Sequence, residues 1–184
     1  MQQQIPDDQK IISQTKSWIE KVVIGLNFCP FASREFRRGA IHYNVVNSSD
    51  RMEILTQLAL EFQRLDENAD IETTLIILPG QFPDFNDYLD IIDLCEDLLE
   101  EEDHEGTYQI ASFHPSYLFA GTTEKDASNF TNRSPYPMIH IIREATITQV
   151  YEKYPDTERI PERNIVVANE KGLELMKELW RSCF

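Results

Sequence analysis

Cysteine and glycine are both scarce in this chain of 184 residues, and their scarcity excludes several classes of protein. The three cysteines, Cys29, Cys95 and Cys183, are odd in number and include no Cys-x-x-Cys pair, which argues against a disulfide framework and for a reducing compartment. The 6 glycines form no glycine-rich phosphate loop, so a nucleotide cradle of the usual kind is not expected. The patterns Gly-x-Ser-x-Gly and His-Glu-x-x-His are also absent from the sequence.

Positive charge and long apolar runs are lacking as well. The 17 lysines and arginines face 32 aspartates and glutamates, which gives a formal net charge of −15. Such a surface repels phosphate groups, so we expect neither nucleic acid nor a membrane as a partner. No apolar run approaches the roughly 20 residues that span a bilayer, and residues 1–8 do not resemble a signal peptide. We therefore expect a cytoplasmic protein with a single domain over residues 1–184.

The spacing of apolar residues predicts long helices that alternate with short strands. Expected strands cover 41–46, 73–78, 107–113 and 138–142, and expected helices cover 7–26, 50–65, 84–99, a short segment opened by a capping box at Thr146 and Gln149, and 164–180 with a weak point at Gly172. This order favours an α/β fold with a mostly parallel or mixed four-stranded sheet flanked by helices. A ferredoxin-like α+β arrangement is the alternative, because no helix separates the third and fourth strands.

The segment around Cys29 is the first whose composition core packing does not explain. Three arginines, Arg34, Arg37 and Arg38, follow it within nine residues in an otherwise acidic chain. Nearby positive charge stabilises a thiolate and lowers the pKa of a cysteine. The alternative is that Cys29 is packed between neighbouring phenylalanines, with the arginines on a solvated turn.

A histidine, His114, stands at the end of the third expected strand and is followed by Pro115. Ligands of open α/β sheets collect outside the carboxyl ends of the strands, where a histidine suits acid–base chemistry or metal binding. The competing interpretation is a hydrogen-bonded structural histidine.

A long polar loop over residues 126–137 is the third such segment. It carries Asn132, Arg133 and Ser134, and its arginine has the geometry to hold a carboxylate or phosphate through two hydrogen bonds. In the strand that follows, His140 shares a face with Met138 and Ile142, opposite Arg143. The alternative is that the loop residues form turns and that His140 is a satisfied core histidine.

Several of these segments together resemble an uncharacterised bacterial family, which is known only as a domain of unknown function (the 1415 family). The resemblance rests on residues 18–31, 72–76, 113–115, 132–137 and 140–144, and the stretch Thr-Asn-Arg-Ser-Pro-Tyr-Pro is its most specific part. It implies a bacterial, cytoplasmic, single-domain protein and no assigned activity.

These observations favour a small-molecule enzyme that acts on an anionic substrate. Cys29 would be the nucleophile, His114 or His140 the general base, and Glu144 would orient a histidine. The groups expected to hold the anion are Arg38, Asn132, Arg133, Ser134 and Arg143. One objection is topological, since Cys29 precedes the first strand and so starts at the end of the sheet opposite the carboxyl ends of the strands.

Two alternatives remain open at this point. The first is a site for a divalent metal such as zinc, built from Cys29, His114 and His140 with Glu144 or His42 as a fourth ligand. The second is a binding or interaction module without catalytic activity, in which the polar loop docks a partner or a metabolite and Cys29 is inert.

Overall fold

Four strands form one mixed sheet in the computed structural model, which describes residues 6–153 and 159–184 and the side chains of 6–148 and 159–184. The strands are β1 (Ile41–Val45), β2 (Thr73–Ile77), β3 (Tyr108–Phe113) and β4 (Met138–Arg143), in the spatial order β1-β2-β4-β3. β1 and β2 are parallel, whereas β4 is antiparallel to both of its neighbours. The α/β prediction is therefore confirmed, and the ferredoxin-like alternative is wrong because β1 and β2 are adjacent parallel strands joined by a helix.

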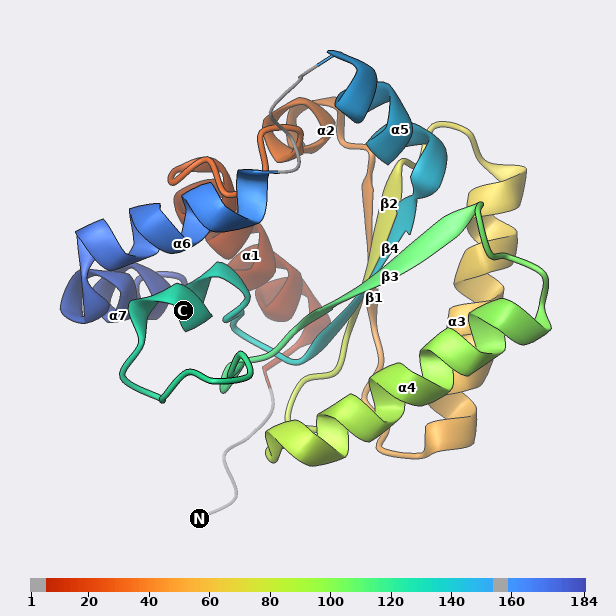
Figure 1. Cartoon of the computed structure of the whole chain (residues 1–184). Coiled ribbons are helices and arrows are strands. Elements are labelled where there is room, and N and C mark those ends of the chain that lie inside the picture. Colours follow the sequence, from red (N-terminus) through yellow and green to blue (C-terminus); the bar gives the residue numbers. More distant parts are fainter. Residues whose placement is uncertain (1–5, 154–158) are drawn as a thin grey trace.

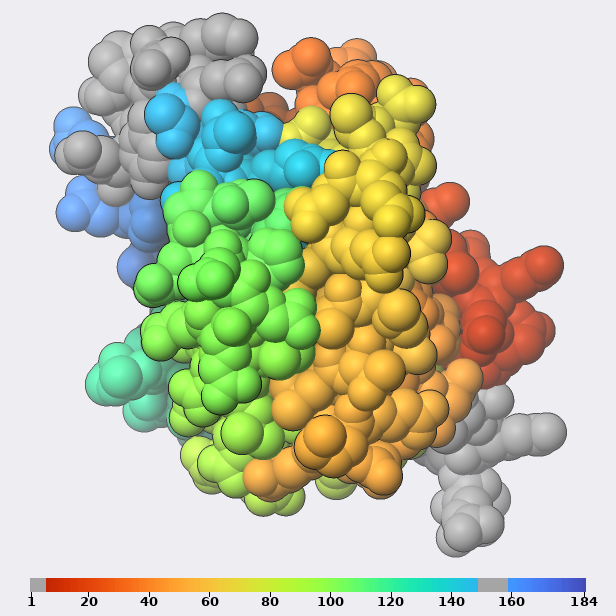
Figure 2. All heavy atoms as spheres, turned by 90° about the vertical axis from the view of Figure 1, so that its right-hand side faces the viewer, coloured from red at the N-terminus to blue at the C-terminus, as the bar shows by residue number. Residues whose placement is uncertain are grey.

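Helices cover both faces of the sheet (Figure 1). They are α1 (Asp8–Trp18), the π-helix η1 (Ile19–Ile24), α2 (Ala32–Arg38), α3 (Arg51–Glu67), α4 (Phe85–Glu101), the 3-10 helix η2 (Ala127–Thr131), α5 (Glu144–Lys153), α6 (Ile160–Lys171) and α7 (Leu173–Arg181). α3 and α4 lie side by side over one face (Figures 1 and 2). α1, α6 and α7 lie on the other, and α2 and α5 lie together at the end where β1 and β2 begin. No helix in the described part of the chain is long and apolar enough to cross a membrane.

The face under α3 and α4 is an apolar core with two well-capped helices. The Asp50 carboxylate accepts from the Met52 backbone N–H, and Asp84 caps α4 in the same way, so both helices begin where the sequence indicates. Cys95 is fully buried in this core, and burial raises its pKa to about 12. Cys95 is therefore a small core residue.

The opposite face is held together by two tryptophans. The indole N–H of Trp18 in α1 donates to the Arg133 carbonyl at 3.0 Å, and that of Trp180 in α7 donates to the Ser134 carbonyl at 2.9 Å. The two carbonyls are neighbours in the polar loop that follows η2. This loop is therefore pinned between the first and the last helices of the chain.

Helix boundaries differ from the predicted ones in the short elements. α2 occupies residues for which the sequence predicted no helix, since seven residues give too few turns for a clear periodic pattern. α5 begins at Glu144, directly after β4, so Thr146 lies inside the helix and the predicted capping box is wrong. The Thr146 hydroxyl donates to the Glu72 carboxylate instead. The expected connection from Pro155 to Pro161 lies partly outside the described residues. The side chain of Gln149 lies outside them as well.

The first predicted helix changes its winding before it ends. After Trp18 the chain forms a π-helix, in which the Gly25 N–H donates to the Glu20 carbonyl five residues back. A side chain at Gly25 would collide with the Lys21 carbonyl oxygen, so glycine is required by close approach and not by its φ angle. π-helical turns of this kind occur frequently at functional sites.

Replacement of Gly25 by alanine is expected to lower the free energy of unfolding by about 3 kcal/mol, because the added Cβ forces the turn apart. Gly106→Ala is the matched control, since Gly106 has a φ of +76° but open space around its Cα. Left-handed strain alone costs this control about 1 kcal/mol. Urea unfolding measures both losses, and equal losses would show that the close approach at Gly25 is unimportant.

Candidate functional site

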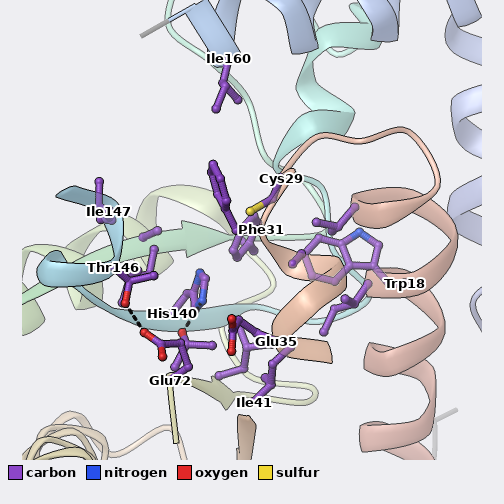
Figure 3. Close-up of a pocket in the computed structure, with 18 of the residues that line it drawn as sticks. Trp18, Cys29, Phe31, Glu35, Ile41, Glu72, His140, Thr146, Ile147 and Ile160 are labelled. Carbon is purple, nitrogen blue, oxygen red and sulfur yellow. Dashed lines mark hydrogen bonds between the residues drawn. The ribbon is translucent and has the colours of Figure 1, made fainter. Parts of the chain in front are cut away.

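A cavity of about 380 Å³ lies against the face of the sheet that α1 and η1 cover, beneath α2 and α5 (Figure 3). Most of its wall is apolar, with Trp18, Phe31, Leu75, Phe113 and Ile147 among its lining residues. It includes the beginnings of β1 and β2 and the end of β4. The prediction placed a ligand at the carboxyl ends of the strands, whereas this cavity lies at the opposite end of the sheet.

His140 in the middle of β4 is a polar group on the floor of this cavity. Its Nε2 lies 2.7 Å from the Thr73 hydroxyl, and that hydroxyl donates its only proton to the Ile141 carbonyl at 2.5 Å. Nε2 must therefore carry the imidazole proton and donate to Thr73. The other ring nitrogen, Nδ1, is left with an unused lone pair, and it is buried without a partner.

Burial lowers the pKa of His140 to about 4. The imidazole is therefore neutral at physiological pH, because burial disfavours the cation. A neutral imidazole with a proton fixed on Nε2 leaves Nδ1 as a hydrogen-bond acceptor.

Cys29 lines the same cavity from the loop between η1 and α2. Two side chains of α6 hold this loop, as Arg163 donates to the Asn27 carbonyl and Asn164 donates to the Phe28 carbonyl at 2.7 Å. Burial raises the pKa of the Cys29 thiol, although backbone N–H groups that follow it in the chain and the charge of Arg163 act in the other direction. The cation that influences this thiol is thus Arg163, which the sequence did not indicate.

The arginines of α2 serve a different group. Arg38 contacts the Glu35 carboxylate at 2.8 Å, and Arg34 contacts it at 3.5 Å. Glu35 is nearly buried and lines the cavity, as does Glu72 at the start of β2. Figure 3 shows the Glu72 side chain bonded to Thr146, at the end of the cavity where His140 lies. The described part of the lining contains no lysine or arginine.

His114 occupies a separate environment beside α4. Its Nε2 bonds the Phe82 carbonyl at 2.9 Å, its Nδ1 accepts from the Ser116 N–H at 3.0 Å, and its ring packs against Phe85 and Tyr88. Burial lowers the pKa of this histidine as well. It has the partners of a structural histidine and is not part of the described cavity lining.

Two of the three arginines expected to hold an anion, Arg133 and Arg143, bind backbone carbonyls instead. Arg133 Nε donates to the Tyr117 carbonyl at 3.1 Å, and its guanidinium lies over the Phe130 ring. Arg143 faces α3, where it donates to the Leu65 carbonyl at 2.5 Å and to the Ile71 carbonyl at 3.2 Å. Both side chains therefore tie loops and helix ends to the sheet.

The remaining candidates also lie apart from the cavity. Asn132 donates to the Ser112 carbonyl at 3.3 Å, Ser134 donates to the Tyr136 carbonyl at 2.5 Å, and the Glu144 N–H bonds the Thr107 carbonyl at 2.9 Å. His42 faces α3, with its Nε2 3.6 Å from the Glu61 carboxylate. Among the residues that the structure describes, no three histidine, cysteine, aspartate or glutamate side chains are grouped closely enough to hold a metal ion.

Sequence reasoning brought Cys29 and His140 to attention, and both line the cavity. It missed Glu35, Glu72 and Thr146, because single polar residues at the ends of strands and helices carry no pattern of their own. The only available signal was the alternation in β2, which places Thr73 and Leu75 on one face of the sheet. The partners of Thr73 and Leu75 on β4, and the contact of Glu72 with Thr146 in α5, depend on long-range strand order.

These features define an α/β protein with a largely apolar cavity on one face of a mixed sheet. The chain belongs to the DUF1415 family, described as proteins of unknown function, whose model matches residues 10–178. The resemblance noted from the sequence is thereby confirmed. No curated protein and no solved structure matches the chain.

His140 is expected to remain neutral, with its proton on Nε2, from pH 5 to pH 8, because its pKa is lowered to about 4. Long-range ¹H–¹⁵N NMR correlations of the imidazole report both the tautomer and the charge, and His140→Asn identifies the signals. Thr73→Val removes the group that accepts from Nε2 and should release the tautomer. Titration of His140 near its ordinary pKa of about 6.5 would contradict this assignment.

Cys29 is expected to react slowly with iodoacetamide at pH 7.5, about tenfold or more below a free small thiol, because burial raises its pKa. Mass spectrometry of the alkylated protein measures the rate, with Cys95 and Cys183 as internal controls. Arg163→Gln should slow the reaction further. An apparent pKa below that of a free thiol would show instead that the thiolate is primed.

Proposed function

We propose that this protein binds a small, largely apolar molecule in the cavity between the sheet, α2 and α5. The observation that carries the proposal is the Nδ1 atom of His140, a buried acceptor without a partner. Leaving such an atom unpaired costs about 1–3 kcal/mol, and a ligand that donates a hydrogen bond to it recovers that energy. Apolar cavities of about 300–1,000 Å³ with a few directed polar groups are typical ligand sites.

Binding is better supported than thiol catalysis, although Cys29 and His140 line one cavity. A thiol nucleophile needs a base that accepts its proton. The pKa of the Cys29 thiol is raised and that of His140 is lowered to about 4, so transfer of a proton from the first to the second is strongly unfavourable. The geometry of the cavity therefore favours a binding role over a thiol enzyme, at a place other than the polar loop.

An anionic ligand is also not what this lining favours. Its acidic side chains are Glu35 and Glu72, Arg38 is already paired with Glu35, and Arg133 and Arg143 bind elsewhere. A carboxylate or phosphate would have to be buried beside like charges without a compensating cation. A neutral or positively charged molecule fits the described lining better.

Nile red, a neutral apolar dye, is expected to bind the protein with a rise in its fluorescence. Ala111→Phe should weaken that binding about tenfold or more, because Ala111 lines the cavity and the added ring fills it. Ala145→Phe is the matched control, since Ala145 is exposed on α5 and is not part of the lining. Circular dichroism establishes that both variants fold.

Two results would contradict the proposal. One is equal binding of Nile red to the wild-type protein and to Ala111→Phe, which would place the dye elsewhere on the surface. The other is that neither Nile red nor 1-octanol, a smaller competitor, binds the wild-type protein at all.

A further inference from the structure

We infer that the ligand of this cavity is an apolar amine, bound in its protonated form through the imidazole of His140 and the carboxylate of Glu72. The inference rests on the proposed function and adds the chemical class of the ligand. Two features of this end of the cavity support it. Most of its hydrogen-bonding groups already have partners, and the charge of the Glu72 carboxylate is not paired by a described side chain.

The protons of the polar side chains around His140 already have hydrogen-bond acceptors within the protein. The Thr73 hydroxyl donates to the Ile141 carbonyl, His140 Nε2 donates to Thr73, and the Thr146 hydroxyl donates to Glu72. What remains free is a set of lone pairs, on Nδ1 of His140 and on the Glu72 carboxylate. A ligand that completes this end must therefore supply N–H or O–H groups.

The charges of the lining distinguish between the donor groups that a ligand could carry. Of the two carboxylates in the lining, Glu35 is paired with Arg34 and Arg38, whereas Glu72 has no ion-pair partner among the described side chains. A carboxylate at the edge of an apolar cavity is stabilised by an opposite charge brought beside it, and a charge-assisted hydrogen bond is about twice as strong as a neutral one. A protonated amine supplies the charge and three donors at once.

The rest of the cavity wall indicates which kind of group the ligand carries besides its amine. Trp18, Phe31 and Phe113 are large apolar groups of its wall, and Figure 3 shows Cys29 beside Phe31 on the side away from Glu72. The positive charge of Arg163 acts on Cys29. This asymmetry orients the molecule, with its amine toward Glu72 and His140 and its apolar body toward Cys29 and the aromatic wall.

Four naphthalene derivatives of nearly equal size test the inference by displacement of Nile red. They are 2-naphthylmethylamine, 2-naphthylmethanol, 2-(methoxymethyl)naphthalene and 2-naphthoate. The amine is expected to bind at least tenfold more tightly than the methoxymethyl compound, the alcohol between them, and the naphthoate most weakly.

Variants locate the contacts that produce this order. Glu72→Gln retains an oxygen that accepts from Thr146, so it should fold normally, weaken the amine about tenfold and leave the methoxymethyl compound unchanged. His140→Phe removes the Nδ1 acceptor and should weaken the amine and the alcohol alike. Glu144→Gln makes the same change of charge outside the described lining and should alter nothing.

The outcomes separate this inference from the proposed function. If all four compounds displace Nile red equally well, or the naphthoate binds most tightly, the cavity binds apolar molecules but the amine is wrong. If the alcohol equals the amine and Glu72→Gln has no effect, a neutral donor is bound and the inference is also overturned. If neither Nile red nor any of the four compounds binds, both proposals fail.

Discussion

The insertion of β4 between β2 and β3 is the constraint on which the architecture depends. β4 runs antiparallel to both neighbours, so it begins where they end and ends where they begin. The loop before it consequently stays at the carboxyl ends of the parallel strands, and α5, which follows it without a break, is delivered to the opposite end. Pairing also sets His140 opposite Leu75 on one side and Ala111 on the other, which places an imidazole on the floor of the cavity.

Local patterns in the sequence predicted the elements better than their arrangement. The four strands were found because runs such as Thr73–Ile77 are apolar and flanked by helical periodicity, and the faces of His140 and Arg143 followed from simple alternation. The central position of β4 could not be predicted, because it depends on pairing with β2, more than 60 residues earlier in the chain, as well as with β3. The contact between Glu72 and Thr146 depends on the position of β4, so it could not be predicted from the sequence either.

The polar loop shows why a distinctive sequence is not always a binding site. Asn132, Arg133 and Ser134 attracted attention as donors for an anion, yet the carbonyl groups of Arg133 and Ser134 are what the fold uses, as acceptors for Trp18 and Trp180. The Arg133 side chain in turn satisfies carbonyls of the preceding loop. Both the side chains and the backbone of this segment have partners that the fold requires, so the segment tolerates few substitutions. Its distinctive sequence therefore reflects a structural role.

The π-helix η1 makes the wall of the cavity depend on the number of residues in one helical turn. Its bonds reach back five residues where an α-helix reaches back four, so it holds one residue more than an uninterrupted helix needs. Deletion of a single residue between Ile19 and Ile24 would restore the ordinary winding, because the π-turn holds the extra residue that an α-helix of the same length lacks. The loop that carries Cys29 and Phe31 follows this turn directly, so the number of residues in the turn determines where the loop begins beside the cavity.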